Sequence, residues 1–249
     1  MLLRRIYQFL IIYALGIGLL LAVKYGLGLS DYVIPDLASV FGVFRDEAER
    51  YFLDVFDTLS VAVVGQISSI LLALLVGITG RQATWFGSFV KVAAYNIQAY
   101  PIVALAPIIF ILLGDGFLSR LLIAAMICYF PLLLSVLGIM SEPIPDVEHF
   151  YRATGRMRWQ LEVKIRAFEN LSKLTTVVSG SATLAMAGTI VAEFIAANAG
   201  IGYAIRIALY QSDLAKVLAA LFSIGITLSI YQGTLEWLGA AVKERWAGA

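Results

Sequence analysis

The chain carries few side chains of the kinds that perform covalent or metal chemistry. It has one histidine, His149, and one cysteine, Cys128, among 249 residues, which leaves little material for a zinc site. The signatures Gly-x-x-x-x-Gly-Lys-Ser/Thr, His-Glu-x-x-His and Gly-x-Ser-x-Gly do not occur. We therefore expect no catalytic residue, no metal ligand and no cofactor bound by this chain.

The charged side chains are scarce and unevenly distributed. Of 18 basic and 17 acidic residues, 11 lie between Glu142 and Lys173. Charged residues make up 14% of the chain and hydrophobic residues 61%, against about 25% and about 45–50% in soluble domains. A soluble globule of this length could not bury so much apolar surface. The composition predicts an integral membrane protein, and a net charge of +1 without a basic block argues against a nucleic-acid partner.

Six apolar stretches are long enough to cross about 30 Å of hydrocarbon, which takes roughly 20 helical residues. They are Ile6–Val23, Leu59–Ile78, Val90–Leu113, Leu121–Met140, Thr175–Ala197 and Val217–Leu238. The predicted fold class is all-α, a polytopic membrane protein with about six transmembrane helices. The first stretch could instead be a cleavable signal peptide, but its length and the lack of a small-residue cleavage site favour an uncleaved span.

The basic residues predict the orientation of these spans. With the N-terminus inside, 12 of the 18 Lys and Arg residues fall on the cytoplasmic side, so we expect both termini there. Segment 24–57 holds seven acidic and three basic residues, which suits the outer face. Apolar residues at helical spacing between Val40 and Phe56 predict an amphipathic helix on the outer interface. We expect a first unit over residues 1–57 and a transmembrane domain over residues 58–249.

The longest cytoplasmic connection, Ser141–Ser172, has helical character of its own. Pro143 and Pro145 end the fourth span, and Asp146 can cap a new helix. Apolar residues recur on one face of that helix, and a second amphipathic piece runs from Trp159 to Phe168. Such cytoplasmic helices either rest on lipid headgroups or dock on a soluble partner, and periodicity alone leaves the two interpretations near even.

The residues of this connection resemble a known permease loop. The run His149-Phe150-Tyr151-Arg152-Ala153-Thr154-Gly155-Arg156-Met157-Arg158-Trp159-Gln160, with Ile165 ten residues after the glycine, is similar to the loop of binding-protein-dependent ABC importers. That family's pattern is Glu-Ala-Ala, three residues, Gly, nine residues, Ile, one residue, Leu-Pro. Pro101-Ile-Val-Ala-Leu-Ala-Pro107 with Gly114-Asp-Gly-Phe-Leu-Ser-Arg120, and Ala192–Tyr203, resemble the nitrate/sulfonate/taurine branch. The resemblance covers about Thr58 to Arg245.

The chain departs from the family pattern at two places. His149-Phe150-Tyr151 stands for Glu-Ala-Ala, and Ala167-Phe168 stands for Leu-Pro. Bulky aromatic residues there imply a reshaped contact with the ATPase, as in one half of a heterodimer or a branch with a dedicated ATPase. Phe168 in place of proline predicts a more continuously helical entry to the fifth span.

The resemblance implies a function and a set of partners. The chain would be the permease subunit of an importer in the bacterial inner membrane, and not itself an enzyme. Its partners would be cytoplasmic ABC ATPase subunits that use ATP, an external or periplasmic solute-binding protein and a second permease copy, with a homodimer as the default. The implied solute is a sulfonate, taurine, nitrate or a related nutrient, although some relatives carry vitamin precursors. The residues expected to couple to the ATPase are His149, Phe150, Tyr151, Ala153, Thr154, Gly155, Arg158, Trp159 and Ile165.

Two other function classes remain open on the sequence. A passive channel would give no reason for a long cytoplasmic docking segment. An intramembrane enzyme is disfavoured because Leu112-Leu113-Gly114-Asp115 only approximates the Gly-x-Gly-Asp of aspartyl proteases and no second Asp lies in a span.

Polar residues and prolines in the spans predict the translocation path or its gate. Charges inside a membrane are costly, and prolines bend helices and free carbonyl groups. Glu193 is either part of an outer gate or a structural carboxylate held by the turn at Asn198–Gly202, and the second is slightly favoured. The candidate path residues are Asn96, Gln98, Pro101, Pro107, Glu193 and Asn198.

Overall fold

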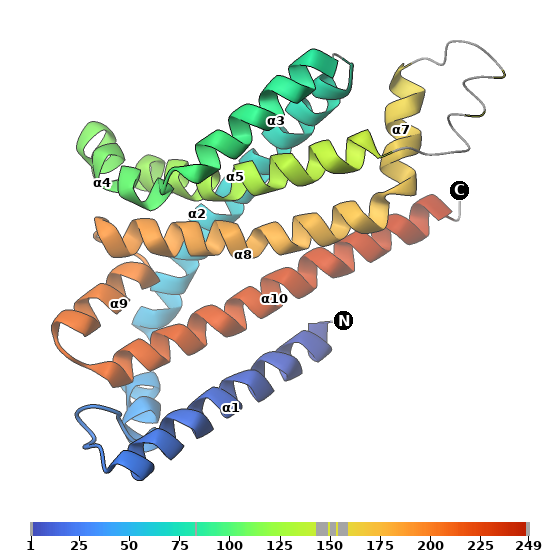
Figure 1. Ribbon diagram of the computed structural model, residues 1–249. Coiled ribbons are helices and arrows are strands. Elements are labelled where there is room, and N and C mark those ends of the chain that lie inside the picture. Colours follow the sequence, from blue (N-terminus) through green and yellow to red (C-terminus); the bar gives the residue numbers. More distant parts are fainter. Residues whose placement is uncertain (1, 83, 143–148, 150–152, 154–158, 248–249) are drawn as a thin grey trace.

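The computed structural model describes residues 2–82, 84–142, 149, 153 and 159–247, and within these it contains helices and turns but no strand (Figure 1). The helices are α1 (Leu2–Leu27), α2 (Leu37–Gln82), α3 (Thr84–Ala99), α4 (Ile102–Leu113), α5 (Phe117–Ser141), α7 (Trp159–Glu169), α8 (Leu171–Ile195), α9 (Ile201–Tyr210) and α10 (Leu214–Ala247).

The predicted all-α membrane fold is confirmed. Helices α1, α2, α5, α8 and α10 are each long and apolar enough to cross a bilayer, and the pair α3 and α4 forms a sixth candidate span. The two ends of the chain and α7 lie at the same end of the molecule, whereas α4, α9 and the α1–α2 connection lie at the other (Figure 1). The predicted orientation makes the first of these ends cytoplasmic.

The third span, predicted over Val90–Leu113 with prolines that can bend it, consists of two separate helices. Helices α3 and α4 meet at 86°. The break falls at Tyr100 and Pro101, where the proline ring removes a backbone donor and disfavours helical geometry at the preceding residue.

The predicted outer amphipathic helix is the first part of α2, which has 46 residues and a break at Glu47. At 1.5 Å per residue α2 is about 69 Å long, more than the full thickness of a bilayer. Its start is capped by Asp36, whose carboxylate accepts hydrogen bonds from the Ser39 hydroxyl and N–H, and these bonds lower the pKa of Asp36. Val40 and Tyr51 are buried against α9 and α10, so this apolar face packs on protein rather than lying only on lipid.

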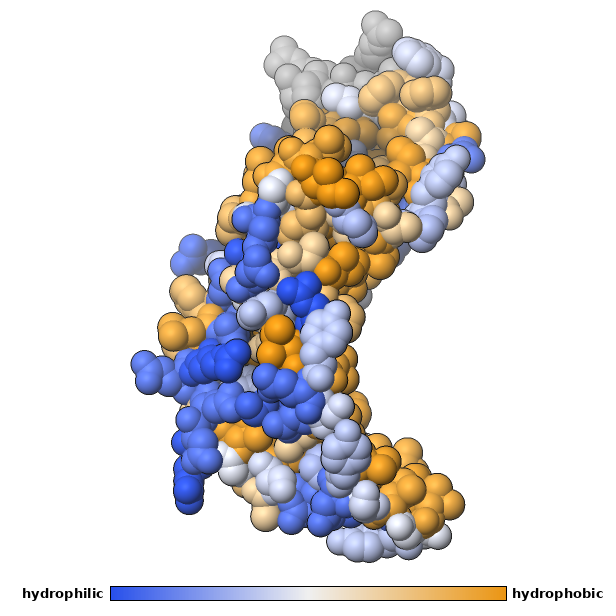
Figure 2. Space-filling model, turned by 90° about the vertical axis from the view of Figure 1, so that its left-hand side faces the viewer, coloured by the Kyte–Doolittle hydropathy of each residue, from blue (hydrophilic) through white to orange (hydrophobic). Residues whose placement is uncertain are grey.

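Hydrophilic residues gather along one side of the outer end, whose outline is hollowed on the other side (Figure 2). Exposed charged residues of this end include Arg45, Asp46 and Arg50 of α2. Their position agrees with the predicted outer location of segment 24–57.

The bundle is centred on α5 and α8, with α2 crossing behind α5, α8 and α10 (Figure 1). Small residues allow α5 and α8 to approach closely, since a Cβ added at Gly188 of α8 would come within 3.0 Å of the Ala124 Cα of α5. Helix α1 is peripheral and packs on α10, where the Phe9 ring covers Gly225 and the Tyr13 hydroxyl donates to the Leu218 carbonyl at 3.0 Å.

The entry to the fifth span is interrupted, so the continuity predicted from Phe168 is wrong. Helix α7 ends at Glu169, Asn170 takes φ −100° and ψ 14°, and α8 begins at Leu171. The Asn170 side chain donates to the Arg166 carbonyl at 3.1 Å, a local bond of the kind by which Asn competes with helical geometry. In Figure 1, α7 is turned away from the axis of α8.

Candidate functional site

A buried carboxylate lies near the outer end of the bundle. Glu193 on α8 is 0% exposed. Its Oε2 accepts hydrogen bonds from the Thr58 hydroxyl at 2.8 Å and from the Gly202 N–H at 3.0 Å. Its Oε1 lies 3.4 Å from the Arg120 guanidinium, which also pairs with Asp57. We call Asp57, Thr58, Arg120, Glu193 and the Gly202 N–H the outer cluster.

The outer cluster depends on a close backbone approach by the turn before α9. Gly200 has φ +88°, and a Cβ there would lie 2.3 Å from the Glu193 carboxylate, so a side chain cannot be accommodated. The Ile201 N–H donates to the Thr58 hydroxyl at 2.9 Å. Two of the N–H groups at the start of α9 are thereby satisfied by α2 and α8. The geometry favours the structural interpretation of Glu193, and a role in gating stays a prediction.

Asn198 lies at the surface of the same end. Its amide donates to the Asp115 carboxylate at 2.6 Å, which links the α8–α9 turn to the α4–α5 turn. Asn198 is exposed. A role of Asn198 in gating stays a prediction.

The break between α3 and α4 brings four of the predicted path residues into one region. Pro101 directly precedes α4, and Pro107 lies inside this helix and is exposed. The Asn96 amide donates back to the Val92 carbonyl at 2.9 Å. The Gln98 Nε2 is buried and has no hydrogen-bond partner in the described part of the chain. A bent helix with polar side chains at the bend suits a path that opens and closes, and this assignment remains a prediction.

A second polar cluster lies in the middle of the bundle. The Gln66 Nε2 donates to the Val178 carbonyl at 2.7 Å and to the Ser181 hydroxyl at 2.9 Å, and the Tyr231 hydroxyl donates to Gln66 Oε1. Gln66 is 1% exposed. These bonds join α2, α8 and α10 through a buried side chain, so they fix the relative positions of the three helices.

The cytoplasmic end holds α7 against the end of α5. Arg166 of α7 is 3% exposed and donates to the Glu142 carbonyl, while Lys173 of α8 pairs with the Glu142 carboxylate. We call these three residues the α7 clamp. Ile165, which matches the loop pattern, is half-buried in α7.

The coupling residues predicted from the loop are only partly within the described residues. His149 and Ala153 have helical backbone and exposed side chains, and Trp159 is the first residue of α7. Phe150, Tyr151, Thr154, Gly155 and Arg158 lie outside the described residues.

Sequence reasoning missed Arg120 and the α7 clamp. Arg120 is 7% exposed, and its two carboxylate partners are 63 and 73 residues away in the sequence. A charge at the edge of an apolar run is costly unless it is paired, so the position of Arg120 in the sequence already indicated that its side chain has a partner. The identity of that partner is a property of the packed bundle.

Residues 69–244 match the family described as binding-protein-dependent transport system inner membrane component. The chain belongs to this family. The permease is therefore a transport component and a multi-pass protein of the bacterial inner membrane, as the sequence predicted.

Two curated relatives are similar over most of their length. The riboflavin transport system permease protein RibX of Chloroflexus aurantiacus is 34% identical over 217 residues, which are 85% of this chain and 81% of the relative. The formylaminopyrimidine transport permease protein ThiX of Halalkalibacterium halodurans is 24% identical over 200 residues, 78% of each chain. Their names support the importer class and do not support the nitrate/sulfonate/taurine branch.

Proposed function

We propose that the permease pairs with a second permease subunit to form the solute path of an ATP-driven importer. Cytoplasmic ATPase subunits use the ATP, and an external solute-binding protein delivers the solute. The observation that carries this proposal is the family match over residues 69–244. A homodimer is the simpler assembly, and the divergent loop at His149-Phe150-Tyr151 keeps a heterodimer as the alternative.

Coupling runs through α7 and α8. The docking region for the ATPase is the segment between α5 and α7, and the α7 clamp joins α7 to two spans, α5 and α8. Helix α8 has 25 residues, about 37 Å at 1.5 Å per residue, and carries Ser181 near its middle and Glu193 near its outer end. A displacement of α7 therefore acts on both polar clusters, which is the contiguous connection that coupling between distant sites requires.

The solute we propose is a small heteroaromatic nutrient. The resemblance to the nitrate/sulfonate/taurine branch pointed to an anion, but the two relatives are named for riboflavin and formylaminopyrimidine. Tyr95 and Tyr100 beside the α3–α4 break are 57% and 68% exposed and could stack on a planar ring. The basic residues nearest the outer end are already engaged, since Arg120 pairs with carboxylates and Arg206 donates to three carbonyls of residues 194–197.

The ATPase assignment is tested by co-purification from mild detergent after co-expression with the importer's ATPase. We expect the wild type to retain the ATPase and Gly155→Glu to lose it. Gly116→Glu is the matched control, because Gly116 lies at the outer end with open space around its Cα. Failure of the wild type to retain an ATPase would contradict the coupling role.

The solute is tested by uptake into proteoliposomes that contain the assembled importer and its binding protein. We expect ATP-dependent uptake of riboflavin or formylaminopyrimidine and none of taurine or nitrate. If taurine or nitrate is taken up and the two heteroaromatic solutes are not, the proposal is wrong and the permease belongs to the nitrate/sulfonate/taurine branch that its sequence resembles. Solute movement that needs no ATP would instead favour a passive channel.

A further inference from the structure

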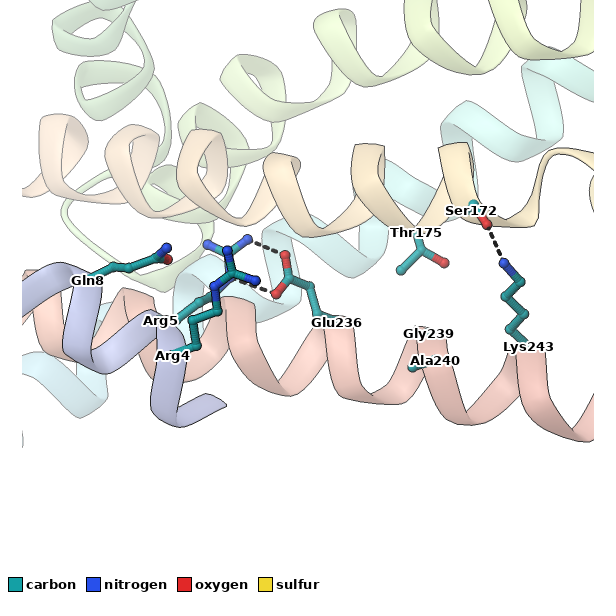
Figure 3. Close-up of a pocket in the computed structure, with 9 residues that line it drawn as sticks. All are labelled: Arg4, Arg5, Gln8, Ser172, Thr175, Glu236, Gly239, Ala240 and Lys243. Atoms are coloured by element: carbon teal, nitrogen blue, oxygen red, sulfur yellow. Dashed lines mark hydrogen bonds and ion pairs between the residues drawn. The ribbon is translucent and has the colours of Figure 1, made fainter. Parts of the chain in front are cut away.

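A cavity at the cytoplasmic end lies between α1, α8 and α10. Its volume is about 510 Å³. Its lining residues are Arg4, Arg5, Gln8, Ser172, Thr175, Glu236, Gly239, Ala240 and Lys243 (Figure 3). Helices α8 and α10 touch closely beneath it, since a Cβ on Gly239 would come within 2.1 Å of the Thr175 side chain. Because α8 and α10 are in contact here, the cavity is the gap between α1 and α8.

The charges around the cavity are unbalanced. Arg5 donates to the Glu236 carboxylate and, at 2.7 Å, to Gln232, so this basic residue is neutralised. Among the described residues, the one partner of the Lys243 ammonium is the Ser172 hydroxyl, at 3.0 Å. The exposed Arg4 has no hydrogen-bond or ion-pair partner among the residues that the structure describes. Two positive charges are therefore left facing the cavity.

The position of the cavity favours a lipid headgroup over a free phosphate as the anion that binds there. It opens at the cytoplasmic ends of three membrane-spanning helices, which is the level of the inner-leaflet headgroups. Leu3, Tyr7 and Trp237, which neighbour lining residues in the sequence, are 84%, 65% and 61% exposed, so exposed apolar side chains adjoin the lining residues of α1 and α10. A free phosphate would use the charges but not this apolar surface.

We propose that the cavity binds the headgroup of an anionic phospholipid. The phosphate lies between Arg4 and Lys243, with the Ser172 hydroxyl as a further donor, and the acyl chains follow the exposed apolar side chains of α1 and α10. The bound lipid joins α1 to the start of α8, one residue from Lys173 of the α7 clamp. Helix α1 lies outside residues 69–244, which match the family, so the site combines one helix outside the matched segment with two helices inside it.

Native mass spectrometry of the purified permease tests this proposal, with phosphatidylglycerol and phosphatidylcholine added separately. We expect one tightly retained phosphatidylglycerol per chain and no retained phosphatidylcholine. The double variant Arg4→Gln/Lys243→Gln should bind phosphatidylglycerol roughly 30-fold more weakly, the effect of two basic side chains at an anionic surface. Ala240→Leu fills the cavity without changing any charge, and it should also abolish the retained lipid.

The matched control is Lys91→Gln/Arg245→Gln, which removes two exposed cytoplasmic charges outside the cavity and should leave binding unchanged. Inorganic phosphate at millimolar concentration should not displace the lipid. Equal loss in the control and test variants, or displacement by inorganic phosphate, would overturn the proposal in favour of general surface attraction or a free-anion site. A melting temperature equal to that of the wild type shows that the variants are folded.

Discussion

Replacing Arg120 by glutamine should destabilise the permease far more than replacing Glu193 by glutamine. Arg120 is the single cation among the side chains of the outer cluster and lies against two carboxylates, Asp57 and Glu193. Glu193 is 0% exposed, so without Arg120 its charge is buried beside a second negative charge. Removing one partner of a buried ion pair costs about 3–5 kcal/mol.

The reverse substitution leaves a smaller defect. In Glu193→Gln the amide oxygen still accepts the hydrogen bonds of Thr58 and Gly202, and Arg120 keeps Asp57 as its partner. We expect a loss of about 1 kcal/mol. With the buried charge gone, adding Arg120→Gln should cost about 1–3 kcal/mol less than it does in the wild type, which is the coupling expected of residues in one network.

Thermal unfolding in detergent measures this cycle. A loss of 3–5 kcal/mol corresponds to a decrease of about 6–20 °C in the melting temperature of a chain of this size. Arg45→Gln, on a side chain that is 88% exposed, is the control and should shift stability by less than about 0.5 kcal/mol. Equal effects of the two single variants, or strict additivity in the double variant, would refute the reasoning.

Three further substitutions test other contacts. Gly200→Ala should cost about 1–3 kcal/mol, because φ is +88° and the new Cβ would lie 2.3 Å from the Glu193 carboxylate; an unchanged melting temperature would contradict this. Gln66→Leu and Tyr231→Phe should show a coupling of about 0.6 kcal/mol in a double-mutant cycle, and zero coupling would mean that their hydrogen bond contributes nothing. Gly225→Val should displace the Phe9 ring of α1, which lies 2.1 Å from the position of the new Cβ. A loosened α1 should make the α1–α2 connection more rapidly cleaved by protease in detergent. An unchanged rate of proteolysis would show that other contacts hold α1.

Two glycines serve as matched controls for these variants. Gly28 also has positive φ, at +60°, but nothing lies near its Cα, so Gly28→Ala carries the backbone strain without the collision. Gly16 is in α1 and faces open space, so Gly16→Val should leave α1 attached.

Local properties of the sequence predicted the helices well and their interruptions poorly. The lengths of the apolar runs identified the five long apolar helices and the bent α3–α4 pair, which is the sixth candidate span, because a bilayer imposes one minimum length on every crossing. Pro101 is visible in the sequence, but the same proline is compatible with a mild kink or with the observed 86° bend. Because Phe168 stands where the family has a proline, no break was expected before α8. The structure nevertheless has a break two residues later, at Asn170.

The sequence by itself determined the class of this protein, an inner-membrane importer permease with a charged cytoplasmic segment, because composition, span length and the Gly155–Ile165 spacing are all local to the chain. Only the tertiary structure decided what the polar residues contact. Arg120 meets Asp57 and Glu193 across 63 and 73 residues of chain, and Arg4 and Lys243 come to opposite sides of one cavity from the two ends of the sequence. The physical reason is that spacing along a helix gives the face on which a side chain lies, whereas its partner depends on which helix packs against that face.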